Sequence, residues 1–460
     1  MTTDSGVALT VNGAQILNAG NIAINGGGTN TELYIGNNVL LWKGGTVTLS
    51  TATGGGNAYI EQSGNSFSLT LTNVDNTIQG NGIIGNNGLS VLNDAAGTIL
   101  ANAPGQTLLL NGSGTVTNNG TLQADSGSAL HLSAVSFTNF SGKTLTGGTY
   151  NVYGTPTSPG IMQIDALGNA GGEIVNNATA ILLNGSNSTL VDAAGKDALS
   201  NFSNNTAAGS FTIQNGRNMT TPGDFANAGT VTVGKMSTLT IGSGNPSAST
   251  PSGTDNFNQS AGTTDVNGTL RANTTLNGGT LSGGGTIDGN VDNVGGIITA
   301  SDPGSPDILT INGDYTQETG AELDAYLQGP AAGIGGYSQL VVDGTATLDG
   351  TLDVILGSSF DPHVGENFFL LKTTGVDSSL SGVFSNFDTS NNTLPSDWEL
   401  TYTGCPAGTT GCVDLIYEGP TTPPPPTSTP EPSVFLLLFV GMAMMTIVLK
   451  YRNTMRSGVK

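Results

Sequence analysis

The chain has 460 residues, of which 33 are acidic and 11 are basic, and its formal net charge at pH 7 is −22. So few Lys and Arg residues cannot neutralise a phosphate backbone, so no nucleic-acid partner is expected, and metal cations are the expected charged partners. Gly accounts for 70 residues, but the 36% of apolar residues stand in alternation, which indicates packed strands rather than disorder.

The N-terminal segment, residues 1–6, has neither the basic residues nor the apolar stretch of a signal peptide, and the first basic residue is Lys43. Because the C-terminal end indicates export, we expect a truncated or misassigned start.

A loose repeat runs from about residue 5 to residue 330. Each unit has an apolar residue, an Asn or Gly turn, a Gly-Thr pair and then alternating apolar residues, as in Val116–Leu122 and Phe225–Val231. Glycines recur at intervals of 20 to 23 residues, about the length of one coil of a β-solenoid: Gly97, Gly120 and Gly142, then Gly209 and Gly229.

The repeat predicts an all-β fold, a right-handed parallel β-helix over residues 1–330, in which short strands stack at about 4.8 Å and bury Leu, Val and Ile. Gly and Asn suit its corners because both accept a positive φ. An array of β-sandwich domains is the alternative, although sandwich cores are expected to contain more than the 6% of aromatic residues found here.

Two later segments carry a resemblance. The first, 276–313, includes Leu276-Asn277-Gly278-Gly279-Thr280-Leu281, and the second includes Leu340-Val341-Val342-Asp343-Gly344-Thr345 and Phe368-Phe369-Leu370-Leu371. Both resemble autotransporter passenger domains, the second just before the membrane barrel. The resemblance implies a β-rich cap over residues 331–418. No outer-membrane barrel follows in this sequence, so self-transport through a barrel is not expected.

Few side chains suggest chemistry. Glu322 and Asp324 would share one strand face, a spacing that suits glycosidic chemistry or calcium, but a solvated outer face is the simpler interpretation. Asp361 and His363, with Glu366, resemble a turn more than a metal site.

No cofactor is expected. Calcium is the one candidate, but the sequence contains no calcium-binding motif. His131, between two leucines, is expected to face solvent. A surface polysaccharide-active enzyme would require acids to stack on one face with the rare bases Arg217, Lys235 or Arg271.

The two cysteines, Cys405 and Cys412, lie between alternating runs that begin at Trp398 and end at Tyr417, the pattern of a β-hairpin. A disulfide could close the hairpin, and this bond would suit an oxidising exterior.

The last segment differs from the body in charge and hydropathy. Residues 1–429 carry 32 acids and 7 bases, a net charge of −25, whereas residues 430–460 carry 1 acid and 4 bases, a net charge of +3. A linker, 419–429, contains four consecutive prolines and is expected to be extended. The apolar run 434–449 has no polar face, so it predicts a single transmembrane helix at the short end of what crosses roughly 30 Å of hydrocarbon.

The elements of this tail are a Pro-Glu-Pro motif, the apolar run and a basic end: Pro430, Glu431 and Pro432, then Lys450, Arg452, Arg456 and Lys460. Together they resemble the PEP-CTERM sorting signal of Gram-negative bacteria. The resemblance implies recognition and cleavage by an exosortase, a membrane peptidase, with an inner-membrane intermediate before release or transfer.

These features predict an exported, non-enzymatic protein of the cell surface or extracellular matrix, with an adhesive or structural role and exopolysaccharide as a candidate partner. The polysaccharide-active enzyme on the same scaffold is the alternative.

Overall fold

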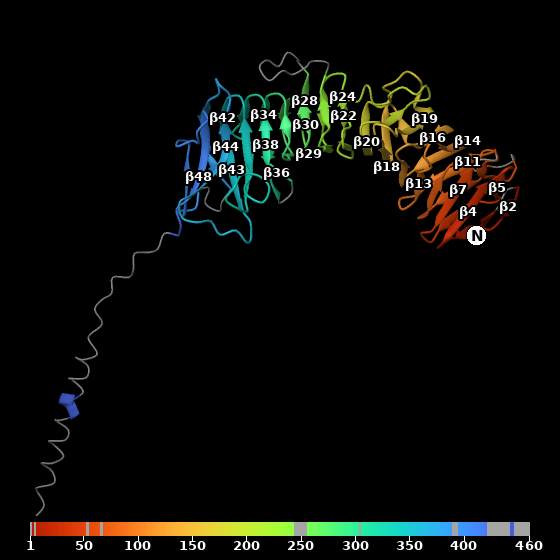
Figure 1. Ribbon diagram of the computed structural model, residues 1–460, viewed down its shortest axis with the longest axis horizontal. Helices are drawn as coiled ribbons and strands as arrows, with labels where there is room; N and C mark the ends of the chain where they lie inside the picture. Colours follow the sequence, from red (N-terminus) through yellow and green to blue (C-terminus); the bar gives the residue numbers. More distant parts are fainter. Residues whose placement is uncertain are drawn as a thin grey trace, which may run out of the picture.

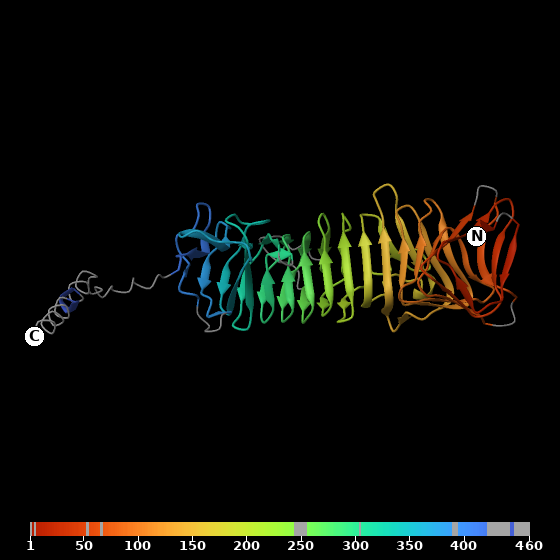
Figure 2. The ribbon, with the colours of Figure 1, turned by 90° about the horizontal axis from the view of Figure 1, so that it is seen from below.

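A computed structural model gives the fold (Figures 1 and 2). It describes residues 2–3, 6–51, 55–64, 68–242, 255–302, 305–388, 394–420 and 442–445. Within these residues the body is an elongated stack of parallel strands, which arches in Figure 1 and runs from the N-terminus at one end to β48 at the other.

Three sheets form the walls of the stack. The long sheet has 25 strands and runs the length of the body. Its strands are β1 (Thr2–Thr3), β4 (Asn21–Gly26), β7 (Thr46–Thr51), β10 (Thr77–Gly80), β13 (Thr98–Ala101), β15 (Thr121–Ala124), β17 (Phe140–Ser141), β18 (Thr144–Tyr153), β20 (Asn176–Asn184), β22 (Asn204–Asn205), β23 (Ser210–Gln214), β25 (Phe225–Asn227), β26 (Thr230–Val233), β28 (Asn256–Gln259), β29 (Thr263–Val266), β31 (Asn273–Leu276), β32 (Thr280–Ser282), β34 (Val291–Asn293), β35 (Ile297–Thr299), β39 (Tyr315–Gln317), β40 (Glu322–Leu327), β42 (Ala346–Leu348), β43 (Thr351–Leu356), β45 (Leu380–Gly382) and β46 (Asn386–Phe387).

The other two sheets each cover part of the body. The N-terminal sheet contains β2 (Ala8–Val11), β3 (Gln15–Leu17), β5 (Thr31–Ile35), β6 (Val39–Trp42), β8 (Ala58–Gln62), β9 (Thr70–Asn73), β11 (Gly82–Asn86), β12 (Ser90–Asn93), β14 (Thr107–Asn118), β16 (Ala129–Phe137), β19 (Gly160–Ile164) and β21 (Ser188–Val191). The C-terminal sheet contains β24 (Met219–Thr220), β27 (Thr238–Thr240), β30 (Thr269–Arg271), β33 (Thr286–Ile287), β38 (Ile308–Ile311), β41 (Gln339–Val342), β44 (Glu366–Thr373), β47 (Trp398–Thr401) and β48 (Gly411–Tyr417). A small hairpin, β36 (Ser301–Asp302) with β37 (Ser305–Pro306), and one 3-10 turn, η1 (Asp165–Leu167), complete the described elements.

The coils vary in length. Thr263 pairs with Thr280, a spacing of 17 residues, whereas Thr351 pairs with Asn386, a spacing of 35 residues.

Many coils place a Gly-Thr pair at the same corner: the amide of Thr121 donates to the carbonyl of Gly97 at 2.9 Å, one coil earlier. Alternation along each strand then buries every second side chain, as the pattern iBiB in β13 and β15 shows.

The glycine spacing is confirmed for Gly97 with Gly120 and for Gly209 with Gly229, where the amide of Thr230 donates to the carbonyl of Gly209 at 2.9 Å, but it fails for Gly142. Gly97 and Gly120 occupy equivalent corners, but the next coil places Thr149 on Gly120, with an amide-to-carbonyl distance of 2.7 Å. Gly142 instead lies in the turn between the antiparallel strands β17 and β18 with φ +56°. The expected equivalence of Gly142 with the other two is therefore wrong, because a hairpin is inserted into that coil.

A buried column of side-chain amides runs through the stack. Asn177, Asn205 and Asn227 are at most 1% exposed, and the side-chain amide of each of the first two donates to the next Asn Oδ1 at 2.9 Å. Asn205 Nδ2 also donates to the carbonyls of Gly209 and Thr230. The column satisfies buried carbonyls at the corners, which would otherwise cost free energy.

Aromatic rings stack in the same part of the core. Phe225 is fully buried and contacts Phe202 and Phe257, with ring centroids 5.0 Å and 5.6 Å apart. The register explains the stacking, because Phe225 and Phe257 are direct partners in β25 and β28.

The body is therefore nearly all β with parallel sheets, consistent with the β-helix that the repeats predict. Parallel pairing also continues across residue 330, for example between β40 and β43, and antiparallel pairing closes the C-terminal sheet at β47 and β48. Cys405 and Cys412 lie at the end of this hairpin and form a disulfide, with their Cα atoms 5.5 Å apart.

The structure contradicts the prediction of a transmembrane helix. In the part of the chain that the structure describes, no helix is long and apolar enough to cross a membrane. The run 434–449 lies outside the described residues except for 442–445, which form one helical turn.

Candidate functional site

A group of carboxylates lies on the outer face of the long sheet near its C-terminal end. Glu322 and Asp324 alternate with the buried residues of β40, and Asp324 pairs directly with Asp353 of β43. Asp388 follows β46 on the next coil, and its amide donates to the carbonyl of Leu352 at 3.3 Å. Carboxylate oxygens of Glu322, Asp353 and Asp388 lie within 4.8 Å of one another.

The close approach of these acids shifts their proton affinities. Burial, then hydrogen bonding with Glu322 and the charges of Glu322, Asp353 and Asp388, raise the pKa of Asp324 to about 8. Burial, then the charges of Asp388 and Glu322, raise the pKa of Asp353 to about 6. Asp324 Oδ1 is buried and has no hydrogen-bond partner. At neutral pH Asp324 therefore keeps its proton, and the group carries less negative charge than its four acids suggest.

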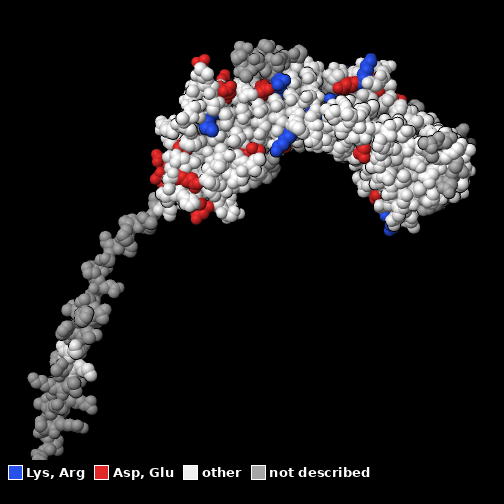
Figure 3. All heavy atoms as spheres, in the orientation of Figure 1, with Lys and Arg blue, Asp and Glu red and all other residues white. Residues whose placement is uncertain are grey.

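The group can share protons or hold a hard cation. Three oxygen ligands at this separation suit calcium in kind but fall short of the six to eight that calcium usually takes. Figure 3 shows acidic side chains gathered at the C-terminal end of the body. Among the described residues the one Lys or Arg ion pair lies elsewhere, at Arg271–Asp288, and the two imidazoles contact other acids, His131 with Asp165 and His363 with Glu366. No described base is thus paired with these carboxylates.

A small apolar pocket adjoins Asp388. Its volume is about 80 Å³, and its walls include Leu352, Phe387, Leu394 and Trp398. Trp398 also packs against Tyr417, with ring centroids 4.9 Å apart, so the pocket lies where the hairpin covers the last coil.

The sequence identified Glu322 and Asp324 and missed Asp353 and Asp388. A signal for Asp353 exists, because Glu322-Leu323-Asp324 and Thr351-Leu352-Asp353 have the same pattern and pair in register. Nothing comparable marks Asp388.

The second predicted cluster is a turn. The amide of His363 donates to Glu366 Oε2 at 2.8 Å, and the amide of Glu366 donates back to the carbonyl of His363 at 2.9 Å. The His363 side chain is 92% exposed, and Asp361 is also exposed. Among the described residues this cluster is not one of the groups of three or more close metal-binding side chains.

The rare bases do not stack on the carboxylates. Arg271 lies on the C-terminal sheet and contacts Asp288, with Nη2 3.2 Å from Oδ2. Arg217 is partly buried between β23 and β24, which lowers its pKa, and its Nη1 donates to the carbonyl of Asn218. Lys235 lies in the turn between β26 and β27. Among the described residues, none of these three bases therefore forms an ion pair with Glu322, Asp324, Asp353 or Asp388.

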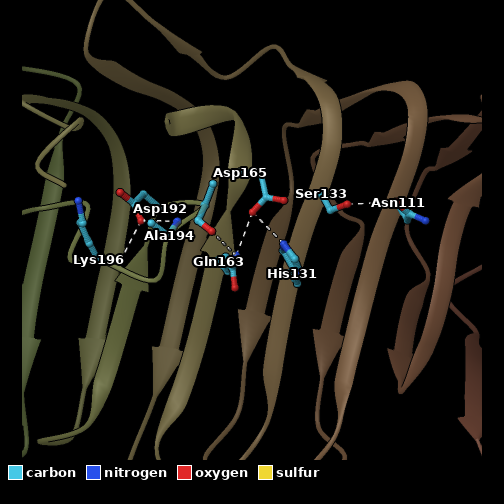
Figure 4. A network of polar contacts seen from close by, with 9 residues as sticks. Asn111, His131, Ser133, Gln163, Asp165, Asp192, Ala194 and Lys196 are labelled. Atoms are coloured by element: carbon cyan, nitrogen blue, oxygen red, sulfur yellow. Dashed lines mark hydrogen bonds and ion pairs between the residues drawn. The ribbon is translucent and has the colours of Figure 1, made fainter. Parts of the chain in front are cut away.

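His131 is more enclosed than the sequence indicated. It lies on the outer face of β16, where its Nε2 is 2.9 Å from Asp165 Oδ1. Gln163 Nε2 donates to the same Oδ1 at 3.0 Å. Figure 4 shows these side chains meeting from neighbouring strands, with Asp192 and Lys196 in the next part of the network. Asp165 therefore holds both His131 and Gln163 in place.

The sorting-motif residues Pro430, Glu431 and Pro432 lie outside the described residues, and so does the basic end from Lys450 to Lys460. Comparison with known proteins finds no family model that matches the sequence and no curated protein that matches it.

Proposed function

We propose that this protein is an exported, non-enzymatic component of the cell surface or extracellular matrix, processed through its Pro-Glu-Pro motif by an exosortase-type peptidase. The observation that carries the proposal is the C-terminal sequence, in which Pro430, Glu431 and Pro432 precede an apolar run and four basic residues at the chain end.

Two features of the body support this proposal. The first is the Cys405–Cys412 disulfide, because such bonds persist in oxidising compartments outside the cytoplasm. The second is the stack itself, because a long solenoid offers an extended outer surface for contacts with matrix polymers.

The polysaccharide-active enzyme has weaker support. Its acids and bases would have to meet on one face, but the carboxylates of the long sheet and Arg271 of the C-terminal sheet lie on different walls. A direct assay for new reducing ends, with the purified protein and a panel of polysaccharides, tests this alternative.

Mass spectrometry of the mature C-terminus tests the sorting step. In cells with the peptidase we expect the chain to end near Pro430, and in cells without it we expect peptides from Val434 to Lys460 to remain. Glu431→Ala should block processing, whereas Pro424→Ala in the linker should leave it unchanged. An intact C-terminus in both cell types would overturn the proposal.

A further inference from the structure

A polar pocket opens at one corner of the N-terminal coils, where the connection between two strands is unusually short. Only Asn81 separates β10 from β11, whereas the next coil has five connecting residues, 102–106, between β13 and β14. Beside the longer corner that includes Gly105 and Gln106, this short corner leaves a pocket of about 310 Å³, a size at the lower end of ligand sites.

The tight corner depends on glycine. Gly80 has φ +105°, and a Cβ at this position would lie 2.0 Å from the carbonyl oxygen of Leu49. A larger residue would force the chain outward and close the space, so the pocket follows from the local sequence.

The polar walls of this corner pocket carry donors and acceptors without charge. They are formed by three carboxamides, two hydroxyls and one imidazole: Asn57, Asn81, Gln106, Thr51, Thr107 and His131. No Asp, Glu, Lys or Arg lines the pocket among the described residues. A carboxamide and a hydroxyl can each donate and accept a hydrogen bond, as a sugar hydroxyl does.

Apolar side chains provide the rest of the surface. Ile83 and Leu109 line the pocket, and the strand register aligns Ile83 with Tyr59 on one side and with Leu109 on the other. Leu109 in turn pairs with His131, and His131 pairs with Gln163. These outward side chains form a row that crosses five coils at about 4.8 Å per coil and continues the pocket.

Hydrogen bonds orient the polar members of the row, Tyr59, His131 and Gln163. Asp165 bonds both His131 and Gln163, as Figure 4 shows, and Asn57 Nδ2 donates to the Tyr59 hydroxyl at 3.2 Å. Polar groups that are already oriented cost less entropy when a ligand binds.

We propose that the corner pocket, with the row from Tyr59 to Gln163 that continues it, binds a segment of a neutral polysaccharide. Sugar hydroxyls bond the carboxamides and hydroxyls, and the C–H faces of the rings pack on Ile83, Leu109 and Tyr59. An acidic polysaccharide finds no cationic partner in this lining. The inference rests on the proposed surface function and names its ligand class.

Isothermal titration of the purified full-length protein tests the inference. The probes are cellohexaose, maltohexaose and laminarihexaose, with hexagalacturonate as the acidic comparison. We expect at least one neutral hexasaccharide to bind with a Kd below about 1 mM, and hexagalacturonate to bind at least tenfold more weakly.

Three variants locate the site. Thr107 and Gln106 are exposed at the start of β14, so their replacement should leave the fold intact, as circular dichroism can verify. Thr107→Arg should fill the pocket and weaken binding at least tenfold, and Gln106→Ala should weaken it about three- to tenfold through a lost hydrogen bond. Gln15→Ala, an exposed glutamine on β3, is the matched control and should bind like the wild type.

Tighter binding of hexagalacturonate, no binding of any neutral probe, or unchanged binding by both pocket variants would overturn the inference. Because the assay uses purified protein, it can fail while C-terminal processing in cells succeeds, and the reverse also holds.

Discussion

Replacing Asp324 with Asn removes an acid whose pKa is raised by burial and by the neighbouring carboxylates. In the folded protein its pKa is about 8 against an ordinary 3.8, so between these values the folded chain holds a proton that the unfolded chain releases. The free energy of unfolding of the wild type therefore falls as the pH rises through this window and levels off above about pH 8. Asp353, whose pKa is raised to about 6, adds a smaller decrease in the free energy of unfolding as the pH rises to about 6.

The magnitude follows from the shift. The rise of the Asp324 pKa from 3.8 to about 8 corresponds to a change of about 5–6 kcal/mol in the free energy of unfolding, at 1.36 kcal/mol per pKa unit. Because Asp324 is partly exposed and interacts with several neighbouring acids, solvent screening and coupling reduce this to about 2 kcal/mol. Asp324→Asn resembles the protonated acid in shape, so it should match the wild type near pH 4 and exceed its stability by about 2 kcal/mol at pH 8.

Urea unfolding followed by Trp398 fluorescence reports on this end of the body. The chain has two Trp residues, so a Trp42→Phe background leaves Trp398, beside Asp388 in the apolar pocket, as the sole Trp reporter. A series with EDTA shows whether a bound divalent cation alters the pH profile. Asp292→Asn, at an exposed carboxylate on the same sheet, is the control for net charge.

Two results would refute the reasoning. The first is a stability difference between Asp324→Asn and the reference that stays constant from pH 4 to pH 8. The second is an equal gain from Asp292→Asn, which would assign the effect to general repulsion in an acidic chain.

Three further substitutions test what holds the coils together. Replacing Cys405 and Cys412 with Ser should destabilise the C-terminal hairpin by about 2–3 kcal/mol, from the entropy of a loop this short, and should remove the sensitivity of the Trp398 signal to reductant. Asn205→Ala should cost about 2–4 kcal/mol in urea unfolding, because it leaves buried polar groups unpaired, whereas Asn204→Ala, on the outer face, should cost less than about 1 kcal/mol. Phe225→Ala should lower the free energy of unfolding by about 3–5 kcal/mol, and a loss below 1 kcal/mol would contradict its place in the stacked core.

The alternation of apolar residues predicts strands and their buried faces well, because a strand exposes every second side chain whatever its partner is. Leu323 and Ala325 are buried and Glu322 and Asp324 face outward, as the sequence indicates. The hairpin that places Trp398 opposite Tyr417 is also visible from the sequence, since both of its strands are local.

The register between coils could not be predicted from the sequence, because the number of residues per coil is not constant. Asp353 stands 29 residues after Asp324, while Asp388 stands 35 residues after Asp353. No single period brings these acids together, so the raised pKa of Asp324 could not be foreseen. The same variation misplaces Gly142, where a hairpin lengthens the coil.

Variation in coil length is also what gives this solenoid its local features. If every coil were equal, each corner would stack on the next and the outer surface would be a smooth column of repeated side chains. The short corner at Asn81 leaves a pocket beside the longer corner 102–106 of the next coil. In the same way, the last coil of 35 residues brings Asp388 back beside Asp353 and leaves room for the apolar pocket under Trp398. Changes in coil length that obscure the repeat in the sequence, whether shortened corners or insertions, are thus the positions where binding surfaces should be sought.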